Sequence, residues 1–198
     1  MKNFKSLSVA LAGIVILFAT ATAQSQTTAK PGPAEAYCTD KGGAVVTRVP
    51  TFGTNGGIPL PLAGPREFCQ FTAHDGSSIH LLLTTLYTTK PTLAALAYYA
   101  APAFDGSSCV GNPGSCYCSQ LGGTDLFGGK NLAGGGWVTS DPSNLYPTLE
   151  ACIFPDLSSI DSWGLTYNSA GIIRGKNLRK VFRYKGPPGT ASTAFGKK

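Results

Sequence analysis

Short runs of β-branched and aromatic residues, separated by stretches rich in Gly and Pro, dominate the first half of the chain. The run 44–49 predicts a strand, and 67–72 predicts a strand that returns after a Gly- and Pro-rich excursion over 50–65. The apolar run 79–87 fits both a helix and a strand. The Ala-, Leu- and Tyr-rich segment 91–101 begins with Pro and predicts a short helix.

The second half of the chain has a comparable order of elements. The segments 137–139 and 150–154 are candidate strands, and 181–184 is also strand-like. The segment 158–161, Ser-Ser-Ile-Asp, matches a capping box and predicts that a helix starts there. By analogy, we expect a helix to start at 77–78 in the first half. The predicted fold class is α+β.

One short pattern occurs twice in the chain. A Tyr-Cys pair is followed by Gly-Gly at the same offset, and a downstream Cys then precedes a Phe and an Asp-containing turn. The residues are Tyr37, Cys38, Gly42, Gly43 and Cys69 in the first copy, and Tyr117, Cys118, Gly122, Gly123 and Cys152 in the second. Self-similarity at a fixed spacing predicts two copies of one small module. We expect each copy to be a β-hairpin-like pair followed by a short helix, closed by its own disulfide.

The repeat divides the chain into consecutive segments. The predicted organisation is a signal peptide at 1–23, a flexible N-terminal segment at 24–36, repeat module 1 at 37–104, a disulfide-ring connector at 105–116, repeat module 2 at 117–185 and a flexible basic tail at 186–198.

The first residues have the features of a secretory leader. Lys2 and Lys5 form a basic start, the apolar run 9–19 is too short to span a bilayer, and Ala21-Thr22-Ala23 is a small-residue cleavage site. The alternative is an N-terminal helix that stays on the protein. We expect cleavage before Gln24 and a periplasmic or secreted product.

An even set of six cysteines in an exported chain predicts three disulfides. If the two copies are equivalent, Cys38 pairs with Cys69 and Cys118 pairs with Cys152. The remaining pair, Cys109 and Cys116, encloses turn signals and can close a small ring. The alternative is a metal site at 116–118, but paired zinc ligands are usually spaced more widely than Cys-x-Cys. We expect no metal and no cofactor.

Composition excludes a disordered chain. Gly and Pro are abundant, at 25 and 14 residues, and only 13% of residues are charged, yet 42% are hydrophobic and 10% aromatic. That apolar content is sufficient for a core, unlike the low-hydrophobicity, high-charge composition of disorder. The polar, Pro-containing stretches at 24–36 and 186–198 are the expected flexible ends.

These motifs resemble a known family. The order Tyr-Cys, Gly-Gly, Cys-x-Phe and an Asp-containing turn is similar to the small exported bacterial hemolysin domain, domain of unknown function 333. The turn is carried by 69–77 in the first copy and by 152–156, with Trp163, in the second. The first copy departs from the family by an insertion, Thr72-Ala73-His74, and by lacking the Trp; the second has Leu157 where Gly is usual. The resemblance implies a bacterial, exported module and supplies no catalytic residues.

The sequence contains few groups suited to catalysis. His74, Asp75 and His80 lie close to Ser77 and Ser78, but neighbours on one turn are poorly placed for a Ser-His-Asp relay. We expect Asp75 to shape a turn and His80 to lie on a partly exposed face. We therefore expect no enzyme activity.

Basic residues are concentrated near the C-terminus. The net charge is +6 for the whole chain and +4 once Lys2 and Lys5 leave with the leader, and no acid follows Asp161. This concentration suits an anionic surface, such as lipid headgroups or wall polymer; the alternative is a solvated face. The candidate binding residues are Arg174, Lys176, Arg179, Lys180, Arg183 and Lys185.

The sequence alone leaves three functions open. The first is an exported, non-enzymatic binding or structural module, whose partner is an unknown protein or an anionic envelope polymer or membrane surface. The second is a secreted inhibitor or toxin-like effector that presents the 109–116 ring or the 52–65 loop rigidly to a partner. The third is a hydrolase, for which no residue set can be assembled. Because export separates the protein from nucleic acid, no nucleic-acid partner is expected.

Overall fold

The computed structural model describes residues 30–55, 59–126, 132–139 and 148–187. The predicted signal peptide and most of the predicted C-terminal tail lie outside these residues. The part from Pro31 onward forms one compact unit. Its helices are α1 Pro33–Asp40, α2 Leu83–Tyr87, α3 Leu93–Ala100, α4 Pro113–Gln120, α5 Ser162–Ser169 and the 3₁₀ helix η1 Leu178–Lys180. Its strands are β1 Ala44–Phe52, β2 Leu60–Pro61, β3 Arg66–Thr72, β4 Ser78–Leu82, β5 Thr124–Asp125, β6 Gly135–Thr139, β7 Ala151–Ile153 and β8 Ser159–Asp161.

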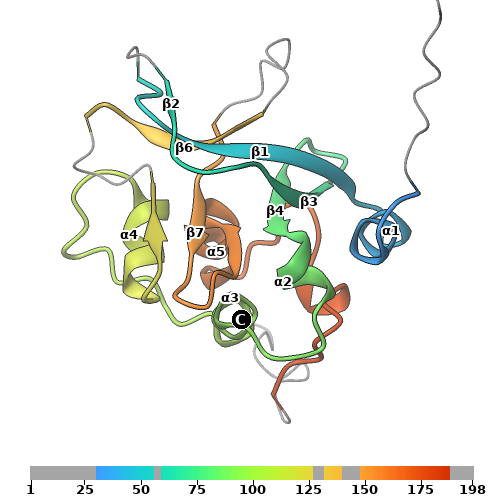
Figure 1. Ribbon diagram of the computed structural model, residues 1–198. Coiled ribbons are helices and arrows are strands. Elements are labelled where there is room, and N and C mark those ends of the chain that lie inside the picture. The colour runs from blue at the N-terminus through green and yellow to red at the C-terminus, as the bar shows by residue number, and fades with distance from the viewer. Residues whose placement is uncertain (1–29, 56–58, 127–131, 140–147, 188–198) are drawn as a thin grey trace, which may run out of the picture. The chain divides into compact units, whose positions relative to one another are not determined.

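The described strands form one antiparallel sheet, so the α+β class is confirmed (Figure 1). The strand order is β2-β1-β3-β4-β8-β7-β5, and β6 pairs with β1. The middle of this order is the contact between β4 and β8, where Leu81 is in register with Ile160. No helix in the described part of the chain is long and apolar enough to cross a bilayer.

Successive strand residues point to opposite faces of the sheet, and the main core, to which the helices contribute, lies on one of these faces. On this face, Phe71 and Ile79 are opposite each other in the β3–β4 register, as are Cys69 and Leu81. All four are almost completely buried and pack in the main core with residues from α1 to α5. The second face carries a smaller apolar cluster, made of Phe68, Trp137, Leu149 and Ala151.

Three disulfides connect the cysteine pairs that the sequence predicted: Cys38–Cys69, Cys109–Cys116 and Cys118–Cys152. Their Cα–Cα distances of 5.8, 5.7 and 5.4 Å are ordinary for disulfides. In the part of the chain that is described, no cysteine is free.

The Gly-Gly pairs have a steric reason. Gly42 and Gly122 have φ of +80° and +81°, a conformation that favours glycine. A Cβ at Gly43 would lie 2.4 Å from Sγ of Cys69, and a Cβ at Gly123 would lie 2.3 Å from Sγ of the equivalent cysteine, Cys152. The second glycine of each pair therefore makes room for the disulfide.

The structure corrects the prediction for the segments around Tyr37-Cys38 and Tyr117-Cys118. Both Tyr-Cys pairs lie on helices, α1 and α4, that the sequence analysis did not predict. Helix α1 begins at Pro33, inside the segment 24–36 that was expected to be flexible. Proline suits the first turn of a helix, because its missing N–H would have no helical partner there. The ring cysteine Cys116 likewise lies within α4 and not in a loop.

The predicted helix start at 158–161 is wrong. Ser159–Asp161 is strand β8, and α5 begins at Ser162, with Asp161 as its N-cap. The analogous prediction at 77–78 is also wrong, because β4 begins at Ser78. The ambiguous run 79–87 contains both structures, since β4 ends at Leu82 and α2 follows directly.

The strand predicted at 181–184 is not formed. The N–H groups of Val181 and Phe182 both donate to the carbonyl oxygen of Leu178, so they continue the turn of η1 and do not join a sheet. Phe182 is fully buried and packs against Tyr98 and Tyr99 of α3. The C-terminal chain therefore packs against α3 through the apolar residues of this segment.

Candidate functional site

A cleft of about 660 Å³ lies on the second face of the sheet, beside the small apolar cluster. Its lining combines strands β1, β3, β4 and β8 and helix α5 with the segments around Glu150 and Arg174. The polar residues of its lining, with one aromatic residue, are Arg48, Gln70, Thr72, Ser78, His80, Thr148, Glu150, Asp161, Arg174 and Trp163.

Strand alternation explains why polar side chains of the β3–β4 hairpin meet in the cleft. Gln70 pairs with His80 and Thr72 pairs with Ser78, while the residues between them point into the main core. Gln70 also donates from Nε2 to Thr72 Oγ1 at 3.2 Å. The two strands therefore present a wall of uncharged hydrogen-bonding groups, with a histidine at its inner end.

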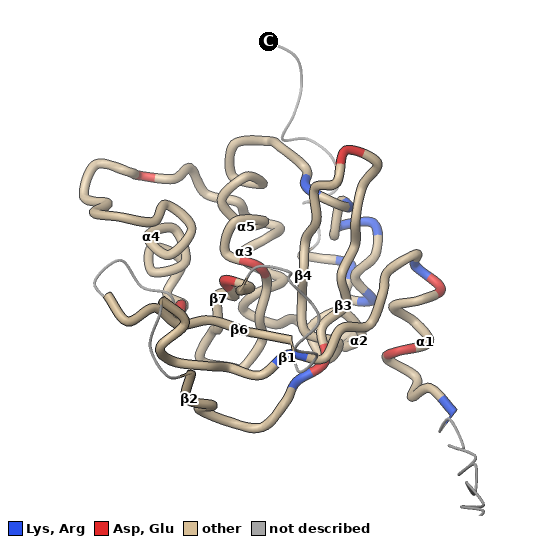
Figure 2. The backbone as a smooth tube through the Cα atoms, turned by 90° about the horizontal axis from the view of Figure 1, so that it is seen from above, with Lys and Arg blue, Asp and Glu red and all other residues tan. Residues whose placement is uncertain are grey.

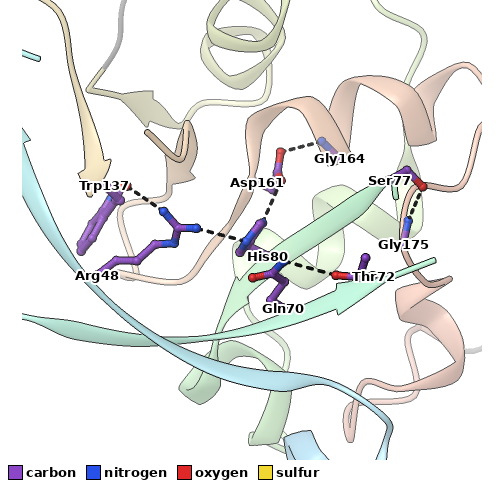
Figure 3. A network of polar contacts seen from close by, with 9 residues as sticks. All are labelled: Arg48, Gln70, Thr72, Ser77, His80, Trp137, Asp161, Gly164 and Gly175. Atoms are coloured by element: carbon purple, nitrogen blue, oxygen red, sulfur yellow. Dashed lines mark hydrogen bonds and ion pairs between the residues drawn. The ribbon is translucent and has the colours of Figure 1, made fainter. Parts of the chain in front are cut away.

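A chain of polar contacts crosses the floor of the cleft from β1 to β8 (Figure 3). Arg48 Nη2 lies 3.4 Å from His80 Nε2, and His80 Nδ1 lies 3.3 Å from Asp161 Oδ2. Because a guanidinium can only donate, the contact with Arg48 is a hydrogen bond in the tautomer of His80 in which Nε2 accepts and Nδ1 carries the proton that faces Asp161. His80 therefore connects a cation on β1 to a carboxylate on β8.

Asp161 also starts helix α5. Its Oδ1 accepts a hydrogen bond from Gly164 N at 2.9 Å, while its Oδ2 faces His80. Both carboxylate oxygens are thus occupied by donors of the protein, and the residue is only 7% exposed. One carboxylate fixes the beginning of a helix and the orientation of the His80 ring.

Arg48 is a buried cation, with 3% of its surface exposed. Its Nη1 donates to the carbonyl oxygen of Trp137 at 3.1 Å, and its Nε has no hydrogen-bond partner. Burial lowers the pKa of Arg48, and the nearby charge of Asp161 partly opposes this. An arginine keeps its charge in proteins, so a positive charge with an unused donor lies in the wall of the cleft.

Glu150 contributes a second carboxylate to the lining. Burial raises the pKa of Glu150, and the charges of Asp125 and Asp161 raise it further, against hydrogen bonds from Asn112 and Trp163. Asn112 Nδ2 donates to Glu150 Oε2 at 2.7 Å, while Asn112 Oδ1 caps α4. Glu150 is therefore connected to the start of α4.

Arg174 approaches the cleft from the C-terminal segment. Its guanidinium carbon lies 4.9 Å from the ring centroid of Tyr167, and its Nε has no hydrogen-bond partner. The next residue, Gly175, donates from its N–H to Ser77 Oγ at 3.1 Å. A Cβ at Gly175 would lie 2.2 Å from the carbonyl oxygen of Phe71, so only glycine allows this close crossing of the β3–β4 hairpin.

Five of the six basic residues predicted as an anionic-surface site contact separate partners. Arg179 donates to the carbonyl oxygens of Tyr98 and Tyr99, at 3.3 and 3.0 Å, near the C-terminus of α3. Arg183 lies over the Tyr87 ring at 4.1 Å.

Lys176 contacts the carbonyl oxygen of Lys41, Lys185 donates to the carbonyl oxygen of Phe182, and Lys180 is exposed. Among the described residues, Figure 2 shows basic positions on the side where β3, β4 and α1 lie and none around α4. Several of these cations hold the C-terminal segment in place.

The structure separates the His and Asp residues that the sequence analysis considered together. Asp75 shapes a turn as expected, since its Oδ1 accepts from Ser77 N at 2.9 Å. His74 is exposed. The expectation for His80 is wrong, since this residue is 6% exposed and lines the cleft. Its partner Asp161 is 81 residues away in the sequence, so the local pattern around His80 did not reveal the contact.

The sequence analysis did not identify Arg48, Glu150, Asp161 or Trp163 as site residues. One signal was available for Arg48, because an arginine within a β-branched strand at an inward position is unusual and needs a polar environment. In the residues that are described, no three His, Cys, Asp or Glu side chains are grouped as metal ligands would be.

The chain matches no protein-family model, no curated protein and no solved structure.

Proposed function

We propose that this protein is an exported, non-enzymatic binding module that holds a polar ligand in the cleft. The observation that carries this proposal is the Arg48–His80–Asp161 chain, in which residues from β1, β4 and β8 hold one another in fixed orientations in the wall of a cleft. Groups that are held in place before a ligand arrives lose little freedom on binding. The three disulfides support the exported compartment, because such bonds persist where the surroundings are oxidising.

The proposal includes two copies of one module, as in the exported domain that the sequence resembles. The strand order supports this, because β1, β3 and β4 follow α1 as β5, β7 and β8 follow α4, and the two series meet at β4 and β8. Backbone hydrogen bonds recur as well: Gly43 N donates to Cys38 O, and Gly123 N to Cys118 O, both at 2.9 Å.

The two copies differ at the hairpin that forms the cleft wall. In β3–β4, register pairs continue beyond Cys69 and Leu81 to Thr72 and Ser78, whereas β7–β8 ends one pair after Cys152. The longer hairpin of the first copy supplies Thr72 and Ser78 to the cleft. We infer that the insertion in the first copy gives this protein its binding wall.

A cleft-filling variant tests the binding function. Thr72 is an exposed strand residue that lines the cleft, and Thr124 is an exposed residue of strand β5 outside it. Purified mature protein is screened by saturation-transfer NMR against neutral saccharides, acidic saccharides, phosphate esters and short peptides. We expect at least one compound to bind the wild type and the control Thr124→Trp, and to lose binding in Thr72→Trp. The absence of any binder, or binding that Thr72→Trp leaves unchanged, would contradict the proposal.

A second candidate function is a secreted inhibitor or toxin-like effector that acts on a protein or membrane. Val110 favours it, because this apolar residue is 77% exposed within the ring closed by Cys109–Cys116. A constrained ring with an exposed apolar side chain suits insertion into a pocket of a partner. Capture of one stoichiometric envelope protein by the wild type and by Thr72→Trp, but not by Val110→Asp, would favour this function over the cleft.

A further inference from the structure

We infer that the ligand of the cleft carries an oxyanion, a carboxylate or a phosphate, which binds between Arg48 and Arg174. This inference rests on the proposed binding function and names the chemistry of its ligand. It follows from the hydrogen-bonding capacity that the charged groups of the cleft leave unused.

Arg48 has a buried charge that the protein itself does not pair directly. Within the described residues, no carboxylate lies in ion-pair distance of its guanidinium, and the contact with Asp161 passes through His80. A buried charge is unfavourable unless it is paired and hydrogen-bonded. Arg48 is only 3% exposed, and its Nε nevertheless has no hydrogen-bond partner. An incoming oxyanion would supply both the charge and the acceptor.

The two acids of the same cleft already accept hydrogen bonds from the protein. Asp161 already accepts from Gly164 N with Oδ1 and faces His80 with Oδ2. Glu150 already accepts from Asn112, and burial raises its pKa. Both acids are thus already engaged by donors of the protein, so they are poorly suited to bind a cationic ligand.

A second arginine, Arg174, lines the same cleft and also has an unused donor. Arg174 stacks on Tyr167, and its Nε has no hydrogen-bond partner. Within the described part of the chain, it forms no ion pair. Arginine presents several N–H groups in a fixed plane that matches the oxygens of carboxylate and phosphate. The stacking on Tyr167 keeps the guanidinium at the cleft.

The size and the remaining lining describe the rest of the ligand. At about 660 Å³ the cleft has the volume of a pocket for a small organic molecule, far more than one anion requires. Gln70, Thr72 and Ser78 offer neutral hydrogen-bonding groups, and Trp163 offers an aromatic surface. An oxyanion attached to an uncharged, polar body fits this lining.

NMR of the arginine Nε–H groups tests the inference directly. ¹⁵N-labelled protein near pH 6 is titrated with inorganic phosphate and, separately, with succinate, at constant ionic strength against sodium chloride. We expect saturable shifts of the Nε–H signals of Arg48 and Arg174 with phosphate, succinate or both, and none with chloride. Shifts with phosphate alone indicate a phosphate-bearing ligand, and shifts with succinate alone indicate a carboxylate.

Two variants make the same chemical change inside and outside the cleft. Arg174→Gln should weaken binding of the effective anion at least tenfold, whereas Arg66→Gln, at an exposed position of β3 outside the cleft, should bind as the wild type does. No saturable shift in the wild type with either anion, or unchanged affinity in Arg174→Gln, overturns the inference. If neutral saccharides bind the cleft while no anion does, this inference fails and the binding module stands. If no compound binds at all, both fail.

Discussion

His80 on β4 and Asp161 on β8 face each other across the middle of the sheet, with His80 Nδ1 3.3 Å from Asp161 Oδ2. They lie beside the register pair of Leu81 and Ile160, which connects the two halves of the strand order. The polar contact lies on the cleft face, and the apolar pair lies in the main core. The same junction therefore holds the halves together and orients the groups of the cleft.

Replacing Asp161 should separate its two roles. Asp161→Ala loses the N-cap of α5, worth about 1 kcal/mol, and leaves buried His80 without its acceptor, worth about 1 to 3 kcal/mol. Asp161→Asn keeps an oxygen for Gly164 N and should lose less. Urea unfolding without reductant measures both variants. Equal losses in the two variants would show that the contact with His80 and the cap cannot be separated in this way.

The second glycine of each Gly-Gly pair should be intolerant of any side chain. Gly43→Ala and Gly123→Ala place a Cβ within about 2.4 Å of a disulfide sulfur. We expect each to lower the free energy of unfolding by about 2 to 4 kcal/mol, comparable to losing a disulfide. Gly64→Ala is the control, because a Cβ there meets nothing within 4 Å. Losses no larger than that of the control would mean that the chain shifts to accommodate the methyl group.

Glu150 should make stability depend on pH. Because burial raises the pKa of Glu150, the folded state binds this proton more tightly than the unfolded state does. The resulting stabilisation is fully present below the ordinary Glu pKa of about 4.3 and is lost as pH rises through the raised value. Glu150→Gln resembles the protonated form. At pH 7, its melting temperature should equal or exceed that of the wild type. At pH 4, where Glu150 of the wild type is protonated, any difference in melting temperature should disappear. A variant that is less stable than the wild type only at pH 7 would contradict this prediction.

The basic C-terminal residues should divide into two groups. Arg179→Gln loses hydrogen bonds to Tyr98 O and Tyr99 O, and Arg183→Gln loses its place over the Tyr87 ring, so each should lower stability by about 1 kcal/mol. Lys180→Gln, at an exposed position, should leave stability within about 0.5 kcal/mol.

Retention on anionic vesicles separates adhesion from these structural roles. If the basic segment binds anionic surfaces, Lys180→Gln should lower retention at low salt without changing the melting temperature, because screening weakens exposed charges beyond about 8 Å at physiological salt. Retention equal to that of the wild type would identify this cation as solvated only.

Sequencing the N-terminus of the product can test the predicted leader. In a bacterial host, the product should begin at Gln24 and occur outside the cytoplasm. N-terminal sequencing and cell fractionation give the result. A membrane-bound product that retains residues 1–23 would contradict the prediction.

The sequence by itself determined the features that depend on local spacing. The repeated Tyr-Cys and Gly-Gly pattern was enough to predict which cysteines pair, because the same cysteines and glycines occur at similar spacing in both copies. In each copy the second glycine makes room for the disulfide. Strands 44–49 and 67–72 were predicted because β-branched runs bounded by turns are read locally.

Tertiary structure decided what depends on contacts between distant residues. Asp161 looked like the end of a capping box, yet it is a helix N-cap and the partner of His80, which lies 81 residues away in the sequence, because β8 pairs with β4. Arg179 and Arg183 looked like free surface charges, yet tyrosine rings and helix carbonyls engage them. Arg48 became a site residue only when β1, β4 and β8 came together in one sheet. Burial and hydrogen-bonding partners are properties of the folded chain, and local pattern does not encode them.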